Sequence, residues 1–114
     1  MTVHDAPSAQ QLVESVREFL ESDVMVATTG RVNFHARVAI NVLKMVEREL
    51  ADGASHDASH TARLGVLGCE TDAQLAQAIR NGEFDDRWAE VVASVKLSVA
   101  DKLRVANPKY FAEA

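Results

Sequence analysis

The sequence predicts an all-α fold, an up-and-down bundle of four to five helices around a central helix near residues 31–50. Apolar residues recur at helical spacing in three long segments, and capping patterns precede two of the helices. Strand-like alternation is confined to one short piece, which has no second strand to pair with. A chain of 114 residues fits a single helical domain, residues 1–114, with one core.

The first helix is predicted over residues 9–25. Ser8 and Gln11 have the spacing of a capping box, in which each side chain bonds the other's backbone N–H. Charged residues occupy the face opposite the apolar one, which is typical of an amphipathic helix. The apolar face consists of Leu12, Val13, Val16, Phe19, Leu20 and Val24. Residues 23–29 are predicted to form a loop.

The central helix begins at Gly30 and is predicted to end near Leu50, where Asp52-Gly53 supplies a stop. Its apolar arc covers more than half of the helical wheel, which is wider than a surface helix needs and predicts packing on two or three sides. The members of the arc are Val32, Phe34, Ala36, Val38, Ala39, Ile40, Val42, Leu43, Met45, Val46 and Leu50.

The rest of the chain is predicted as a polar linker, a short helix, a capped helix and a long last helix. The linker covers residues 54–59 and the short helix residues 60–67. Thr71 and Gln74 form the second capping-box pattern, before a helix that stops at Asn81-Gly82. Asp85 or Asp86 caps the last helix, residues 87–106, which Asn107-Pro108 ends. The main apolar face of this helix consists of Trp88, Val91, Val92, Val95, Val99 and Leu103.

Composition and charge exclude some classes of partner. The net charge of −5 argues against sequence-independent nucleic-acid binding and against an anionic membrane surface. The chain has one cysteine, no apolar run long enough for a membrane span and no signal-peptide core, so we expect a cytoplasmic location.

The sequence holds no convincing catalytic constellation. His56 and His60 have the spacing of the zinc motif H-E-x-x-H, but Asp57 replaces the glutamate and no third ligand is evident, so we predict polar linker residues. Cys69 has no neighbouring cation in sequence and is expected to be an inert thiol. Phosphate-binding and nucleotide-binding glycine motifs are missing. We therefore predict no catalytic residue, no metal site and no cofactor.

The weak candidates for ligand or partner binding lie on the central helix. Arg37, Asn41, Lys44 and Arg48 recur at helical spacing and point the same way. Such a band is more often the solvated face of a buried helix, but it could also bind an acidic helix, a carboxylate or a phosphate. His35 falls inside the apolar arc, where a buried neutral imidazole is the expected role and a ligand-facing one the alternative.

Three segments carry a resemblance to a known family. They are APSAQQLVESVREFL, NFHARVAINVLKMVEREL and VANPKYF, beginning at residues 6, 33 and 105. The chain resembles a small uncharacterised bacterial domain family whose members are encoded beside, or fused to, aminoglycoside-phosphotransferase-like kinases and acyl-CoA dehydrogenases. The resemblance implies a helical module that works with acyl-CoA metabolism, and it assigns no catalytic residues.

These observations favour a non-catalytic accessory module that docks on a kinase-like or acyl-CoA dehydrogenase-like partner. The alternative is a small-ligand binding protein or enzyme, for an acyl or anionic ligand, with a pocket near His35. A homodimer is compatible with either function, with surplus apolar surface such as Ile40, Met45, Leu97 or Val105 paired across a two-fold axis.

Overall fold

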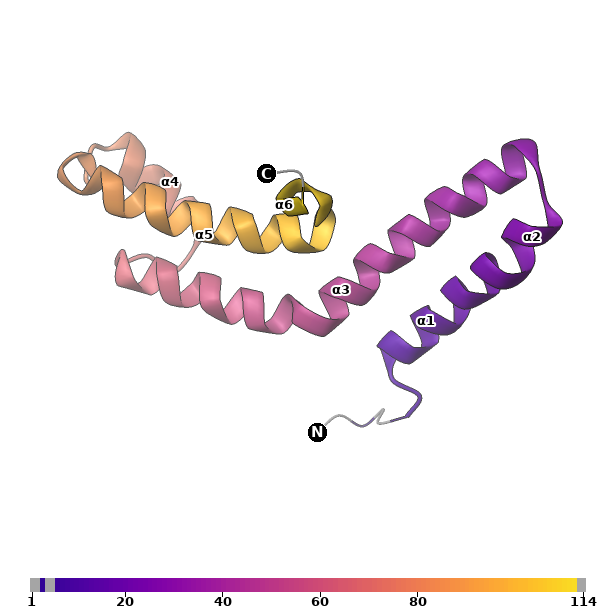
Figure 1. Cartoon of the computed structure of the whole chain (residues 1–114). Coiled ribbons are helices and arrows are strands. Elements are labelled where there is room, and N and C mark those ends of the chain that lie inside the picture. The colour runs from indigo at the N-terminus through magenta and orange to yellow at the C-terminus, as the bar shows by residue number, and fades with distance from the viewer. Residues whose placement is uncertain (1–2, 4–5, 113–114) are drawn as a thin grey trace. The chain divides into compact units, whose positions relative to one another are not determined.

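The computed structural model describes residue 3 and residues 6–112, and it confirms the all-α fold class (Figure 1). The described part of the chain contains no strand. In order, its elements are α1 (Ala9–Phe19), the π-helical segment η1 (Leu20–Val24), α2 (Met25–Ala27), α3 (Gly30–Val66), α4 (Asp72–Arg80), the 3₁₀ turn η2 (Asp85–Arg87), α5 (Trp88–Ala106) and α6 (Lys109–Ala112). None of these helices combines the length and apolarity that a membrane span requires.

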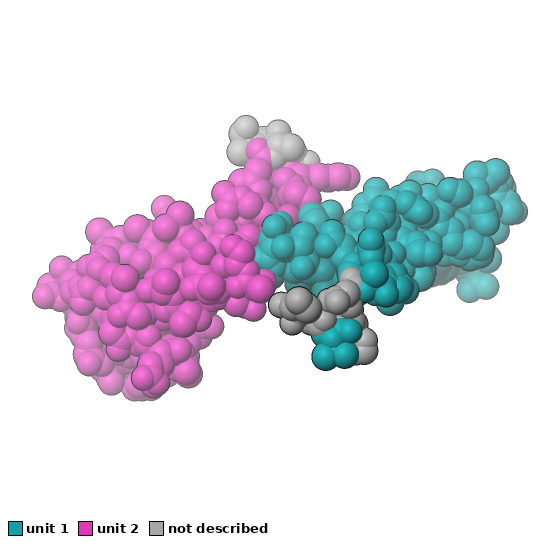
Figure 2. Space-filling model, turned by 90° about the horizontal axis from the view of Figure 1, so that it is seen from below, with its two compact units in different colours: residues 1–53 teal, residues 54–114 magenta. Residues whose placement is uncertain are grey.

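The chain divides into two compact units, residues 1–53 and residues 54–114 (Figure 2). The boundary falls inside α3, so each unit contains part of that helix. We describe the two units separately. The single-domain organisation stays a prediction.

Unit 1 is an antiparallel helical hairpin made of α1, η1, α2 and the first part of α3. The capping box at its start is confirmed: Gln11 N–H donates to Ser8 Oγ at 3.1 Å, and Ser8 N–H donates to Gln11 Oε1 at 2.8 Å. Helical structure continues to Ala27, two residues past the predicted end, so the loop predicted over residues 23–29 shrinks to a turn before Gly30. Asn33 holds this turn by donating to two backbone carbonyls of the preceding segment.

The central helix is much longer than predicted. The stop at Asp52-Gly53 and the linker over residues 54–59 are both wrong, because α3 runs without a break to Val66. A glycine costs a helix only about 1 kcal/mol relative to alanine. That cost is offset by tertiary contacts, since His60 and Arg63 in the extended part both bond to α5.

Unit 2 has a small apolar core. It consists of Leu64, Leu67, Cys69, Leu75, Phe84 and Val91, with Ala78 and Ile79 packed against it. The second capping pattern is confirmed in part: Gln74 N–H donates to Thr71 Oγ1 at 3.1 Å, whereas the Gln74 side chain accepts from Glu70 N–H, one residue before the N-cap. Gly82, at φ +78°, follows the end of α4 as predicted.

The start of α5 differs from the prediction. No side chain caps the helix; Arg87 occupies the N-cap position, and Asp85 and Asp86 form the 3₁₀ turn before it. Its end at Ala106 agrees with the predicted stop before Pro108. The Arg104 guanidinium lies 5.1 Å from the centre of the Phe111 ring, so α6 folds back against the end of α5.

Candidate functional site

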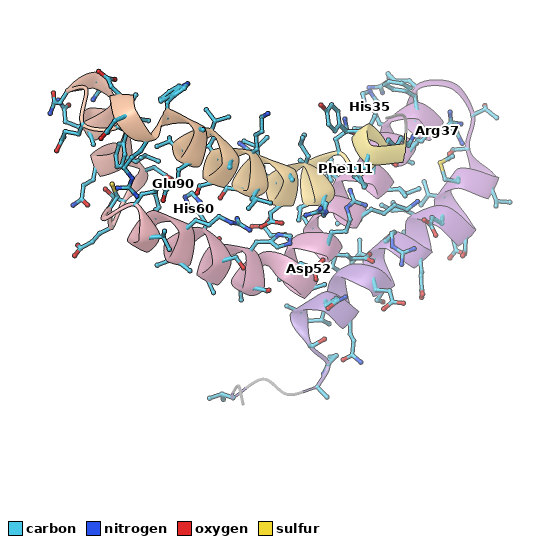
Figure 3. All side chains as sticks on the ribbon, turned by 60° about the vertical axis from the view of Figure 1, so that its left-hand side comes forward. His35, Arg37, Asp52, His60, Glu90 and Phe111 are labelled. Carbon is cyan, nitrogen blue, oxygen red and sulfur yellow. The ribbon has the colours of Figure 1, made fainter. Side chains whose placement is uncertain are left out.

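The densest polar cluster lies in unit 2, where α3 faces α5 and the start of α4. His60, which Figure 3 labels, has Nδ1 2.7 Å from Ser98 Oγ and Nε2 2.7 Å from Asp72 Oδ1. Arg63 donates to the same Ser98 hydroxyl at 3.0 Å and to Asp101 at 3.2 Å. His60 and Arg63 are one turn apart on α3, and Ser98 and Asp101 are one turn apart on α5, so helical spacing aligns them along one seam.

Asp101 contacts cationic side chains of both α3 and α5. Partial burial by itself raises the pKa of this carboxyl, but the Arg63 hydrogen bond and the charges of His56, Arg63 and Arg104 together hold it below its ordinary value. The Asp101 side chain is only 14% exposed and Arg104 contacts it at 2.9 Å. The carboxylate is therefore ionised at neutral pH and ties α3 to α5.

The chain of contacts from Asp72 through His60 to Ser98 has the connectivity of a nucleophile triad. In the tautomer that carries its proton on Nε2, His60 donates a hydrogen bond to Asp72 Oδ1 and accepts one from the Ser98 hydroxyl at Nδ1. Ser98 lies in the middle of α5, where backbone N–H groups bond within the helix and cannot stabilise an oxyanion. The cavity beside it has a volume of only about 10 Å³. We interpret the cluster as a structural hydrogen-bond network between helices and call it the lock, which consists of His60, Arg63, Asp72, Ser98 and Asp101.

A second polar region lies in unit 1, along one edge of the hairpin. It is an open groove of about 420 Å³, lined by Gln10, Arg17, Lys44, Glu47, Arg48, Ala51 and Asp52. Arg17 is already paired, donating to Glu47 at 2.6 Å and to Glu21 at 3.0 Å, and the Glu47 bond is the main reason that its pKa is raised. Lys44 lies 3.8 Å from Glu21. Arg17 and Lys44 therefore face carboxylates of the same unit.

The structure separates the predicted binding residues. Lys44 and Arg48 line the groove, whereas Arg37 and Asn41 are exposed further along α3 and are not part of its lining. The prediction of a buried His35 is wrong. Its imidazole is exposed and meets the Phe34 ring edge-on, with 5.6 Å between the ring centres. His35 lines neither of the two hollows described above. A binding role for these five residues stays a prediction.

The two histidines of the zinc-like motif lie on a helix and share a face, as their spacing allows. His60 is bonded as described, and His56 Nε2 lies 3.9 Å from Asp101. Within the described residues, no group of three His, Cys, Asp or Glu side chains is placed to bind a metal ion. Cys69 is buried in the unit 2 core.

The predicted apolar face of α5 is only partly covered by its own chain, with Val91 buried and Val92 and Leu103 half-buried. Trp88, Val95 and Val99 belong to the predicted apolar face, yet they are between 40% and 52% exposed. They lie one above the other along the helix, and we call them the α5 stripe. The seam toward α3 is apolar at the buried Val91 and polar at Ser98 and Asp101. The three-residue spacing of Ser98 and Asp101 was the sequence signal that could have predicted a polar seam.

The comparisons with known proteins identify the family and add no activity. Neither the curated proteins nor the solved structures include a match to the chain. One family matches residues 26–110, from α2 to the second residue of α6, and is described as a domain of unknown function, DUF6285. Because this match covers well over half of the chain, the protein belongs to the DUF6285 family.

Proposed function

We propose that the protein is a helical interaction module that docks on an enzyme, either a phosphotransferase-like kinase or an acyl-CoA dehydrogenase-like protein. The enzyme classes come from the family resemblance of the sequence, which implies work alongside acyl-CoA metabolism. The docking role is supported by the way in which the chain distributes its polar and apolar side chains.

The observation that carries the proposal is the exposed α5 stripe. A helix that packs inside its own chain normally turns its apolar face inward. In unit 2 the face of α5 toward α3 carries the lock beside the buried Val91, while Trp88 and Val99 are about half exposed and Val95, which borders the hollow beside Ser98, is 40% exposed. Aromatic and aliphatic side chains grouped in this way are typical of interface centres. A partner enzyme that covers the α5 stripe would complete the apolar packing of this helix.

The polar residues point to the same function. The polar side chains of the cluster already have partners in the chain, since His60 bonds Ser98 and Asp72, and Asp101 pairs with Arg63. The hollow next to them is too small for a substrate. Docking through an apolar stripe requires neither a reactive group nor a large pocket.

The experiment that tests the proposal is native mass spectrometry of the tagged protein purified gently from its own host. We expect a mass that contains an enzyme of one of the two classes at fixed stoichiometry. Replacing Val95 and Val99 together by Lys should abolish the complex. Leu97→Lys is the matched control, because Leu97 is 56% exposed on the opposite side of α5. A complex that survives the stripe variant, or a protein that never binds either enzyme, would refute the proposal.

A further inference from the structure

The hairpin of unit 1 leaves one of its faces uncovered. Among the described residues of this unit only Ala36 and Ile40 are buried, both on the side of α3 that faces α1. Seven other apolar side chains of the hairpin stay between 45% and 55% exposed, and two of them, Val38 and Val42, lie on the outer side of α3. The remaining five, which we call the hairpin face, are Leu12, Val16 and Phe19 of α1 and Val32 and Leu50 of α3.

These five residues lie on the same side of the hairpin. With about 100° per residue, Val32 and Leu50 fall on the flank of α3 that is opposite to Lys44 and Arg48. Leu12 and Phe19 likewise fall on the flank of α1 opposite to Gln10. Because Gln10, Lys44 and Arg48 line one groove, the polar flanks of the two helices form one edge. The apolar flanks therefore form the other edge together.

The ion pairs give the register of the two helices. Arg17 is level with Glu47, and Glu21 is level with Lys44, so the helices run antiparallel (Figure 1). Phe19 is then level with Val46, while Leu12 and Val16 are close to the level of Leu50. Val46 is half-buried on the same flank of α3.

A second copy of the chain fits this face. A two-fold axis parallel to the helices would place α1 of each copy on α3 of the other and keep every residue at its own level. Phe19 would then meet Val46 of the second copy, and Val16 would meet its Leu50. All neighbouring helices would be antiparallel, as in an up-and-down four-helix bundle.

Charge also favours this pairing of helices. Residues 9–27 carry four acidic side chains and one basic, whereas residues 30–53 carry four basic and three acidic. Packing α3 on the second copy's α1 brings unlike net charges together, and packing α3 on α3 would not.

The amount of apolar surface is adequate for a dimer. Large apolar side chains have surfaces on the order of 150–250 Å². Five that are half exposed, with their half-buried neighbours, provide several hundred Å², approaching the ~800 Å² per partner of a standard interface. Apolar patches of more than a few hundred Å² often mark interaction sites.

We infer that the protein forms a two-fold homodimer in which the hairpin faces of two copies pack together, with α1 of each copy on α3 of the other. This inference is independent of the proposed docking function, because it uses unit 1 and not the α5 stripe.

The test is sedimentation equilibrium of the full chain over a range of concentrations. We expect twice the 12.4 kDa chain mass at micromolar concentration. Val16→Glu and Leu50→Glu should each raise the dimer dissociation constant on the order of 100-fold or more, because the two-fold axis buries each new charge twice. Val38→Glu is the control, since Val38 is exposed on α3 but lies outside the hairpin face and should leave the constant unchanged. Circular dichroism confirms that each variant is folded.

A cross-linking experiment tests the arrangement without relying on charged variants. In a Cys69→Ala background, Phe19→Cys and Val46→Cys chains are prepared separately, mixed and oxidised. We expect the mixed disulfide to dominate. A predominance of Val46→Cys pairs would mean that α3 packs on α3 and would overturn the arrangement. A protein that remains monomeric at tens of micromolar, or a dimer that both glutamate variants leave intact, would overturn the inference itself.

Discussion

Replacing Leu64 by Ala should destabilise unit 2 strongly. Leu64 is 5% exposed and belongs to the core that joins α3, α4 and α5. The substitution removes three carbon atoms, a transfer loss of about 2.4 kcal/mol at about 0.8 kcal/mol each. The cavity that remains adds to this loss, so we expect about 3 kcal/mol, within the usual range of 2–5 kcal/mol.

Leu97→Ala is the matched control in the same unit. It removes the same three carbon atoms from a side chain that is 56% exposed. Less than half of the transfer loss applies and no cavity forms, so we expect less than about 1 kcal/mol.

The assay is urea unfolding at neutral pH, followed by tryptophan fluorescence and by circular dichroism. Trp88 is the only tryptophan and lies at the start of α5, so fluorescence reports on unit 2. Since a unit of this size has a stability of only several kcal/mol, the midpoint of the Leu64→Ala variant should fall steeply. Equal midpoint shifts for the two variants would refute the core assignment.

Thermal unfolding should give opposite results for alanine substitutions at two glycines. Gly53→Ala should raise the free energy of unfolding by about 0.5–1 kcal/mol, because Gly53 lies in α3 without positive φ and a Cβ would meet only Glu49 Cγ at 3.4 Å. Gly68→Ala should lower the free energy of unfolding by about 1–2 kcal/mol, because Gly68 has φ +77°. Changes of the same sign in the two variants would contradict this reasoning. Thr71→Ala should cost about 1 kcal/mol in urea unfolding by removing the cap of α4, and Thr71→Ser should restore most of it. The lowered pKa of Asp101 means that its contribution to stability is present above about pH 4 and is lost as pH falls toward the folded-state pKa. The stability difference between wild type and Asp101→Asn should therefore shrink between pH 7 and pH 3, and a difference that grows would contradict the sign.

Features set by neighbouring residues were predictable from the sequence. The capping patterns at Ser8 and Thr71 were confirmed because their partners lie three residues away. The end of α5 before Pro108 was confirmed for the same reason, since proline acts on the residue before it.

Features set by distant residues were not predictable. Whether α3 continues past Gly53 depends on contacts of His60 and Arg63 with α5, which follows more than twenty residues later in the chain. Likewise, the pattern of α5 shows that Trp88 and Val95 are on an apolar face but not whether the chain itself covers that face. His35 was placed in the interior for the same reason, because a wide apolar arc was equated with burial.

The starts of α1 and α4 both use glutamine at the third helical position, Gln11 and Gln74, where glutamate is the other common choice. A glutamine amide has no proton to gain on acidification, so both helix starts keep their side-chain bonds at a pH where carboxylates are neutralised. Under those same conditions Asp101 is protonated and its ion pairs with Arg63 and Arg104 are lost. Acid should therefore dissolve the tertiary packing of unit 2 before its helices, leaving a molten globule with native-like far-ultraviolet circular dichroism and exposed apolar surface that binds hydrophobic dyes.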